Sequence, residues 1–128
     1  MNKFILNNQF LLGSASPRRL ELLKQIGINP DLVEAPNIDE TNFKKELPSN
    51  YVKRMAIEKS LILQPKYENS IILTADTVVA LGRRILPKTT DVKMAEDCLR
   101  MISGRRHKVL TSFALCSPNK TLKVKTVV

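Results

Sequence analysis

The sequence has few aromatic residues, two cysteines and one histidine, and each shortage excludes a class of protein. Aromatic side chains make up 5% of the 128 residues, and tryptophan is absent. A stacking platform for single-stranded nucleic acid is therefore not supported. His107 is the only histidine, which excludes a multi-histidine zinc site. No Gly-x-x-x-x-Gly-Lys-Ser/Thr segment occurs, which excludes a P-loop nucleotide site.

Long apolar runs are missing as well. No stretch reaches the roughly 20 apolar residues that a helix needs to cross a bilayer. The apolar run within residues 1–8 is too short for a signal peptide. Cys98 and Cys116 lie far apart without metal-ligand spacing, which is typical of reduced, buried thiols. We therefore expect a cytoplasmic protein without a membrane partner.

Apolar residues and positive charge are both plentiful. Apolar residues make up 43% of the chain, enough for the core of a single domain of this length. The formal net charge is +9, which favours an anionic partner such as a nucleotide, a nucleic acid or an acidic surface. The cations are spread along the chain, and general lysine enrichment would produce the same charge without a functional cause.

The clearest local pattern follows a predicted strand over residues 9–13. A helix is predicted over residues 17–25, with Ser16 as its N-cap and Pro17 at its first position. Arg18 and Arg19 then stand at a helix end where the dipole is already positive. An anion held by these arginines, Ser14, Ser16 and free backbone N–H groups would favour that arrangement. A solvated start of a surface helix explains the pattern equally well.

Hydrophobic periodicity predicts a chain in which strands and helices alternate. The expected strands cover residues 9–13, 30–35, 71–75 with 78–81, 85–86, 108–116 and 121–128, and the expected helices cover 17–25, 49–63 and 92–103. The first helix carries an apolar stripe that we expect to be buried, formed by Leu20, Leu23 and Ile26. Ser49 and Asp91 are the expected N-caps of the other two helices.

Asp76 lies between two apolar strand segments, residues 71–75 and 78–81. Burying an unpaired carboxylate would cost several kcal/mol, so Asp76 should meet a metal, a cation or a backbone donor. The alternative is an aspartate at a turn or bulge that bonds neighbouring N–H groups. The apolar surroundings favour the functional interpretation.

Three other charged residues are candidates for the same site. Lys59 interrupts the apolar stripe of the helix over 49–63, so it must extend to the surface or face an anion in a cleft. Glu40 lies in a polar loop over 37–48, where solvated charge is the ordinary alternative, and Lys88 is an additional cation. Cations with a cradle bind polyphosphate, while carboxylates hold Mg²⁺ and orient a water.

With these residues in view, the sequence resembles the Maf family of nucleoside triphosphate pyrophosphatases. The matching segments cover residues 14–19 with 21–23, residues 51–59, residues 74–79 and residues 99–111. Each segment alone is weak evidence for the family, but all four together, in this order across nearly the whole chain, are specific to it. The resemblance implies an α/β fold of the inosine-triphosphatase type, in which a mixed β-sheet is flanked by helices and a cleft lies between two lobes. It also implies hydrolysis of a nucleoside triphosphate to the monophosphate and pyrophosphate, with Mg²⁺ or Mn²⁺ as the divalent metal.

The resemblance also implies roles for individual residues. Asp76 would be the general base or metal-linked carboxylate that activates water, and Glu40 would be the other metal ligand. Thr77, together with Arg18, matches the dTTP/UTP subgroup. The residues implied to bind substrate are Ser14, Ser16, Arg18, Arg19, Lys59, Thr77 and Lys88.

The sequence departs from the family pattern in two places. Lys88 is followed by Thr89, whereas the family has Lys-Pro. Residues 1–128 also read as one domain that lacks the family's C-terminal segment, so we expect an incomplete second lobe. The alternative function is an inactive remnant that binds nucleotide or a partner chain, and a nucleic-acid-binding module is the least supported. Because residues 124–128 would expose an apolar strand edge, we expect a homodimer or aggregation.

Overall fold

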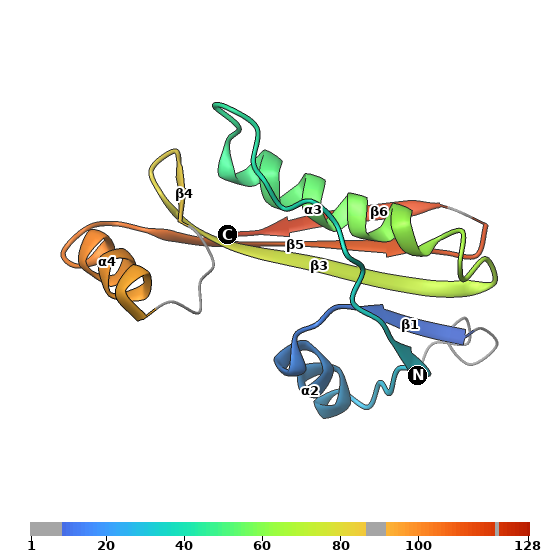
Figure 1. The fold of residues 1–128 in the computed structure, drawn as a ribbon. Helices are drawn as coiled ribbons and strands as arrows, with labels where there is room; N and C mark the ends of the chain where they lie inside the picture. Colours follow the sequence, from blue (N-terminus) through green and yellow to red (C-terminus); the bar gives the residue numbers. More distant parts are fainter. Residues whose placement is uncertain (1–8, 87–91, 120) are drawn as a thin grey trace.

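The computed structural model describes residues 9–86, 92–119 and 121–128 and shows one mixed sheet with three helices around it (Figure 1). Lys88 and Asp91, both named in the sequence analysis, lie outside these residues. The strands are β1 (Gln9–Gly13), β2 (Leu32–Val33), β3 (Ser70–Leu81), β4 (Arg84–Leu86), β5 (Lys108–Cys116) and β6 (Leu122–Val127). The helices are α2 (Pro17–Gln25), α3 (Pro48–Leu63) and α4 (Val92–Ile102).

The sheet has the order β2-β1-β3-β5-β6, and β4 pairs with the far end of β3. β1 pairs in parallel with both β2 and β3, whereas β3–β4, β3–β5 and β5–β6 are antiparallel. The predicted α/β fold with a mixed sheet is therefore confirmed. β3 is the central strand, and it crosses the whole molecule without a break (Figure 1).

One face of the sheet is covered by α3, and the core lies between them (Figure 1). Tyr51, Val52 and Met55 of α3 pack against Val78 and Leu110 of the sheet. A second cluster joins the end of the helix to the other end of the sheet, through Leu11, Leu63, Ile72 and Cys116. Burial of these side chains removes apolar surface from water, which is the main force that holds the helix on the sheet.

Gly13 shows how closely α3 approaches. A Cβ atom at this position would lie 2.4 Å from Leu63 Cδ1 and 2.8 Å from Thr74 Cγ2, closer than carbon atoms can pack. Any larger residue at position 13 would therefore require the Leu63 and Thr74 side chains to shift. The chain turns out of the sheet directly after this glycine, at Ser14.

The other helices differ from the prediction in their burial. The stripe of Leu20, Leu23 and Ile26 was expected to be buried, but no residue of α2 is buried and Ile26 is 71% exposed. α4 likewise has no buried residue, and it projects beyond the end of the sheet (Figure 1). An amphipathic pattern identifies the side of a helix that could be buried, but burial also requires a facing surface. Among the described residues, that surface is incomplete for both helices.

Several predicted boundaries shift by a few residues. The strand expected over 30–35 shrinks to Leu32–Val33. Next to it, the backbone N–H of Asp31 donates to the carbonyl of Phe10 at 2.9 Å, and the Asp31 carboxylate accepts the N–H of Phe10 at 2.7 Å. α3 begins at Pro48 with Leu47 as its N-cap, so the prediction of Ser49 as the cap is wrong. Proline suits the first helical position, which explains why the cap lies two residues earlier than expected. Gly27 and Gly104 follow their helices with φ of 82° and 69°, as glycine at a helix end commonly does.

Two predictions concern the cysteines and the membrane. Cys98 and Cys116 are both free thiols, and Cys116 is buried whereas Cys98 is only half-buried. No helix within the described residues is both long and apolar enough to cross a bilayer.

Candidate active site

The first part of the site is an ion pair beneath α3. Asp76 is only 1% exposed, and its Oδ1 accepts a hydrogen bond from Lys59 Nζ at 3.1 Å. Lys59 also donates to the carbonyl of Ala75 at 3.2 Å. Asp76 therefore lies within a continuous strand and meets a cation, as the functional interpretation predicted, and the alternative of a turn or bulge does not hold.

The local structure explains why Lys59 reaches Asp76. The hydroxyl of Thr74 donates to the carbonyl of Ala56 at 2.7 Å, which ties α3 to β3 less than one helical turn before Lys59. Side chains alternate along a strand, so Thr74 and Asp76 share the face that α3 covers. The lysine stem lies along this packed surface, and its side chain is 12% exposed. Lys59 therefore points into the molecule rather than out to solvent.

Glu40 approaches the same ammonium group from a loop. Its Oε1 lies 3.9 Å from Lys59 Nζ, and its side chain is 53% exposed. The backbone of this loop is held because Tyr51 donates its hydroxyl hydrogen bond to the carbonyl of Glu40. Burial, together with the charges of Asp76 and Glu40, raises the pKa of Tyr51 to about 12. Tyr51 therefore remains a neutral donor at physiological pH.

A hollow of about 230 Å³ opens beside Lys59 and Glu40. It is lined by these two residues, by residues 13–15 at the end of β1 and by residues 35–38 after β2. β1 and β2 are parallel, so their carboxyl ends meet at one edge of the sheet. This is the edge at which open α/β sheets commonly bind ligands.

The second part of the site lies around Ser14 and Arg19. Ser14 Oγ accepts hydrogen bonds from the N–H of Ser16 at 3.1 Å and from Arg19 Nη1 at 3.0 Å. Arg19 Nη2 donates to Thr77 Oγ1 at 3.0 Å, and this hydroxyl lies 2.9 Å from the hydroxyl of Thr111. Partial burial lowers the pKa of Arg19, and the charge of Asp76 partly opposes that shift. The guanidinium is thus fixed in place by neutral hydroxyls.

Ser16 caps α2 as predicted, since its Oγ accepts the N–H of Arg19 at 3.3 Å. The hydroxyl that caps the helix is therefore already engaged. Arg18 is exposed, and its side chain has no hydrogen bond or ion pair with another described residue. The structure thus brings Ser14, Ser16, Arg19 and Thr77 together but leaves Arg18 at the surface.

The two parts of the site lie on opposite faces of β3. Asp76 faces α3, while the next residue, Thr77, faces α2, because successive strand residues alternate. Ser14 connects the two parts, since it binds Arg19 and also lines the hollow beside Lys59. The candidate site therefore wraps around the edge of the sheet where β1 ends.

Sequence reasoning missed the residues that support this site. Tyr51 and Thr111 lie in the segments that match the family, residues 51–59 and 99–111, but no role was assigned to either residue. Arg54 was missed as well: its Nε and Nη2 donate to Glu46 at 2.7 and 2.8 Å, and its guanidinium lies 3.9 Å from the centre of the Phe43 ring. This clamp holds the loop that carries Glu40. An ion pair between α3 and the loop over 37–48 leaves no local pattern in the sequence. The only hint is that acidic residues in the loop precede basic residues in the helix.

The fold has solved counterparts of low sequence identity. A dITP/XTP pyrophosphatase from Mycobacterium abscessus superposes with a TM-score of 0.61 at 18% identity, over 92% of this chain and 70% of that one. The Ham1 protein of Staphylococcus aureus superposes with a TM-score of 0.63 at 16% identity, over 91% and 67%. These matches confirm the expected inosine-triphosphatase type of fold.

Sequence relatives are considerably closer. The chain is 48% identical over 118 residues to a dTTP/UTP pyrophosphatase of Rhodospirillum rubrum, covering 92% of this chain and 56% of the relative. It is 52% identical over 118 residues to one of Zymomonas mobilis, covering 92% and 58%. This chain thus spans less than two thirds of the length of the curated relatives it matches. The family model described as Maf-like protein matches residues 9–128, and this chain belongs to the Maf family.

Proposed function

We propose that this chain hydrolyses dTTP or UTP to the monophosphate and pyrophosphate. The observation that carries the proposal is the buried Asp76–Lys59 pair, at 3.1 Å, next to a hollow that Ser14 and Glu40 line. The similar relatives named as dTTP/UTP pyrophosphatases support the choice of substrate. The reaction is expected in the cytoplasm, where nucleoside triphosphates are made and used.

In this proposal a water attacks the α-phosphorus and the bond between the α-phosphorus and the bridging oxygen breaks, so pyrophosphate leaves. Asp76 accepts the proton of the attacking water and thus acts as the general base. Lys59 and Arg19 are directed at the triphosphate, one from each side of the strand edge. Ser14 and Ser16 line its path, Arg18 and Lys88 add positive charge, and Thr77 orients Arg19.

The residues present fit a divalent cation. Asp76 and Glu40 both approach one point, since each lies within 4 Å of Lys59 Nζ. Within the described residues no group of three or more His, Cys, Asp or Glu side chains could hold a metal. Mg²⁺ commonly uses one or two carboxylates and completes its shell with phosphate oxygens and water. Asp76 and Glu40 would hold Mg²⁺ or Mn²⁺, which would supply positive charge to the phosphates.

The test is release of pyrophosphate from dTTP, UTP and CTP with Mg²⁺ or Mn²⁺, comparing the chain with Asp76→Asn. We expect activity on dTTP or UTP that falls at least about a hundredfold in the variant, the size expected for loss of a general base. Asp97→Asn is the matched control, because Asp97 is an exposed carboxylate on α4.

A second measurement separates hydrolysis from binding. Calorimetry with a dUTP analogue that carries a non-hydrolysable α,β-imido bridge reports binding alone. A folded chain that binds the analogue and releases no more pyrophosphate than Asp76→Asn would contradict the proposed hydrolysis and support the alternative, a nucleotide-binding remnant. A folded chain that does neither would contradict both.

A further inference from the structure

The loop between β2 and α3 carries Glu40, and two side chains fasten it to the first half of α3. The hydroxyl of Tyr51 donates to the backbone carbonyl of Glu40 itself. Three residues further along the helix, Arg54 Nη2 donates to the carbonyl of Thr41 at 3.1 Å. These two hydrogen bonds fix the two peptide groups that follow the Cα atom of Glu40. They therefore set the direction in which the Glu40 side chain leaves the loop.

Arg54 also holds the last part of this loop. It donates to both carboxylate oxygens of Glu46, at 2.7 and 2.8 Å, and the Glu46 side chain is only 8% exposed. This bidentate pair needs the planar donors of arginine, which lysine lacks. Next to Glu46, Lys45 has a φ of 63°, a left-handed backbone that residues other than glycine seldom adopt. The loop keeps this unfavourable conformation because its contacts with α3 outweigh the strain.

The carboxylate of Glu40 is held much less firmly than its backbone. The side chain is 53% exposed, and Lys59 Nζ lies 3.9 Å from its Oε1, which is beyond hydrogen-bond length. The backbone contacts with Tyr51 and Arg54 therefore decide where this carboxylate lies. Asp76 differs in this respect, because it belongs to the central strand and is 1% exposed.

We propose that Tyr51 and Arg54 are positioning residues that hold Glu40 where it binds the divalent cation. The inference rests on the proposed function, in which Asp76 and Glu40 hold Mg²⁺ or Mn²⁺. A ligand on a loosely held loop must become ordered when the cation binds, and this ordering weakens the affinity. A loop that is already fastened to α3 avoids this loss. Both residues thus act on the cation through Glu40, as residues behind a metal ligand commonly do.

The test is the binding of Mn²⁺, measured from the electron paramagnetic resonance signal of the free ion, with the non-hydrolysable dUTP analogue present. Tyr51→Phe removes the hydroxyl that holds Glu40 and keeps the ring in the core. It should raise the Mn²⁺ dissociation constant about tenfold, the size expected for loss of a group that orients a metal ligand. Arg54→Lys keeps the charge but loses the bidentate pair, so it should raise the dissociation constant to a similar degree.

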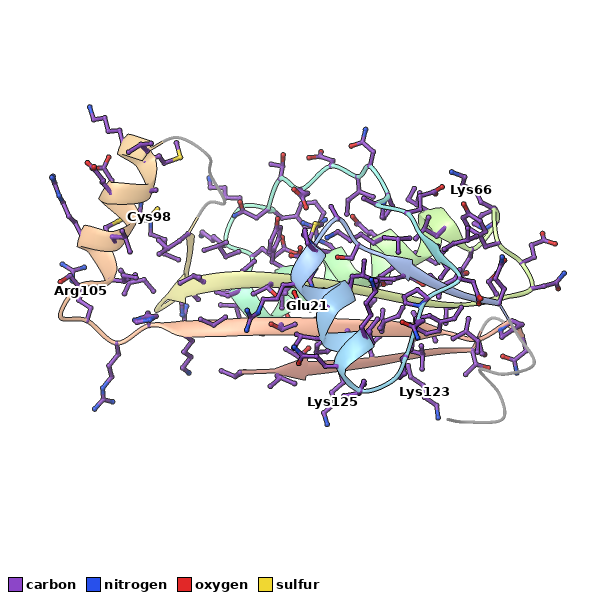
Figure 2. All side chains as sticks on the ribbon, turned by 90° about the horizontal axis from the view of Figure 1, so that it is seen from below. Glu21, Lys66, Cys98, Arg105, Lys123 and Lys125 are labelled. Carbon is purple, nitrogen blue, oxygen red and sulfur yellow. The ribbon has the colours of Figure 1, made fainter. Side chains whose placement is uncertain are left out.

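Tyr67→Phe is the matched control, because it removes the same hydroxyl from a second contact between a tyrosine and this loop. Tyr67 donates to Oε1 of Glu34 at 2.8 Å, next to the Lys66–Glu34 ion pair. This contact lies beyond the last turn of α3, and Figure 2 shows Lys66 at the end of the molecule away from α4. It holds the loop near β2 rather than at Glu40. The Mn²⁺ dissociation constant of Tyr67→Phe should therefore stay within about twofold of the wild-type value.

The same substitutions in a Glu40→Gln background show whether the two residues act through Glu40. There, Tyr51→Phe and Arg54→Lys should change the Mn²⁺ dissociation constant by less than about twofold, because the ligand that they position is gone. An equal effect in both backgrounds would overturn the proposal, since it would indicate a general structural role. Wild-type affinity in Tyr51→Phe or in Glu40→Gln would overturn it as well. Circular dichroism and thermal unfolding check that each variant is folded, and Tyr51→Phe alone decides if Arg54→Lys does not fold.

This measurement does not require turnover, so it separates the positioning role from the proposed hydrolysis. A chain that shows the expected Mn²⁺ binding but releases no pyrophosphate would contradict the hydrolysis and support the positioning role. A folded chain that binds no Mn²⁺, with or without the analogue, would overturn the positioning role whatever its activity.

Discussion

The two faces of the sheet differ in what covers them. On one face α3 buries seven of its sixteen residues, and the Asp76–Lys59 pair lies under it. On the other face α2 buries none, and apolar side chains of β5 remain exposed. The comparison shows that an apolar pattern stabilises a protein only where a second surface meets it. Substitutions on the two faces should therefore have very different effects on the free energy of unfolding.

The largest expected effect comes from breaking the buried ion pair. Lys59→Met should lower the free energy of unfolding by about 3–5 kcal/mol, because it leaves the Asp76 carboxylate buried without the ammonium. Denaturant titration measures this change. Adding Asp76→Asn should recover much of the loss, and no recovery would contradict the electrostatic explanation. Lys66→Met is the matched control, since the Lys66–Glu34 pair, at 2.9 Å, lies at the surface and should contribute little.

The next prediction compares the cost of removing an apolar side chain from each face of the sheet. Met55→Ala, at a fully buried position of α3 that faces the sheet, should cost about 2–5 kcal/mol, since it leaves a cavity. Leu115→Ala on the open face should cost about 1 kcal/mol or less, because much of its side chain already contacts water. Both values come from denaturant titration below the concentration at which the chain associates. Equal costs would show that the two faces are equally covered in solution.

A smaller effect is expected where β1 meets α3. Gly13→Ala should cost about 1–3 kcal/mol, because the added methyl group overlaps Leu63 and Thr74. In a Leu63→Ala background the same substitution should cost less, since the nearest atom has been removed. Thermal unfolding of the wild type, the two single variants and the double variant gives the coupling free energy between positions 13 and 63. If the two costs in unfolding free energy simply add, a methyl group at position 13 does not meet Leu63, and the close approach of β1 to α3 would be contradicted.

The smallest effect concerns pH and the loop that carries Glu40. The hydrogen bonds from Arg54 lower the pKa of Glu46 below its ordinary value. The stability from this pair is therefore present above the ordinary glutamate pKa of about 4.5 and is lost as the pH falls through the lower, folded-state value. Glu46→Gln should flatten this acid-side loss in a pH series of unfolding curves. Arg54→Met should flatten the same part, and an unchanged profile in both would contradict the assignment.

Much of the fold was predictable because it depends on local patterns. The proline and serine at the start of α2, the glycines after α2 and α4, and the apolar runs of β3 and β5 each gave an element within a few residues of its observed bounds. Asp76 could be selected because a charge between two apolar runs is costly unless it has a partner. Its partner Lys59 was visible as a lysine within an apolar stripe.

The remainder depended on contacts between distant segments. That Thr77 meets Thr111, or that Tyr51 holds the loop of Glu40, follows from strand register and helix placement, and neither can be read from local periodicity. The predicted burial of Leu20, Leu23 and Ile26 failed for a related reason. The helical period correctly grouped these residues, but it contains no information on whether a facing surface exists.

The position of β3 at the centre of the sheet also sets an order for folding. Its pairing with β1 joins Gln9 and Ser70, which are 61 positions apart, while β5 and β6 pair across a short turn. Local pairs form quickly and distant ones slowly, so the β5–β6 hairpin should form before the parallel pair. During synthesis from the N-terminus, β1 and β3 emerge before β5 exists. β3 must therefore wait for its antiparallel partner, and in that interval its unpaired, largely apolar edge is open to aggregation.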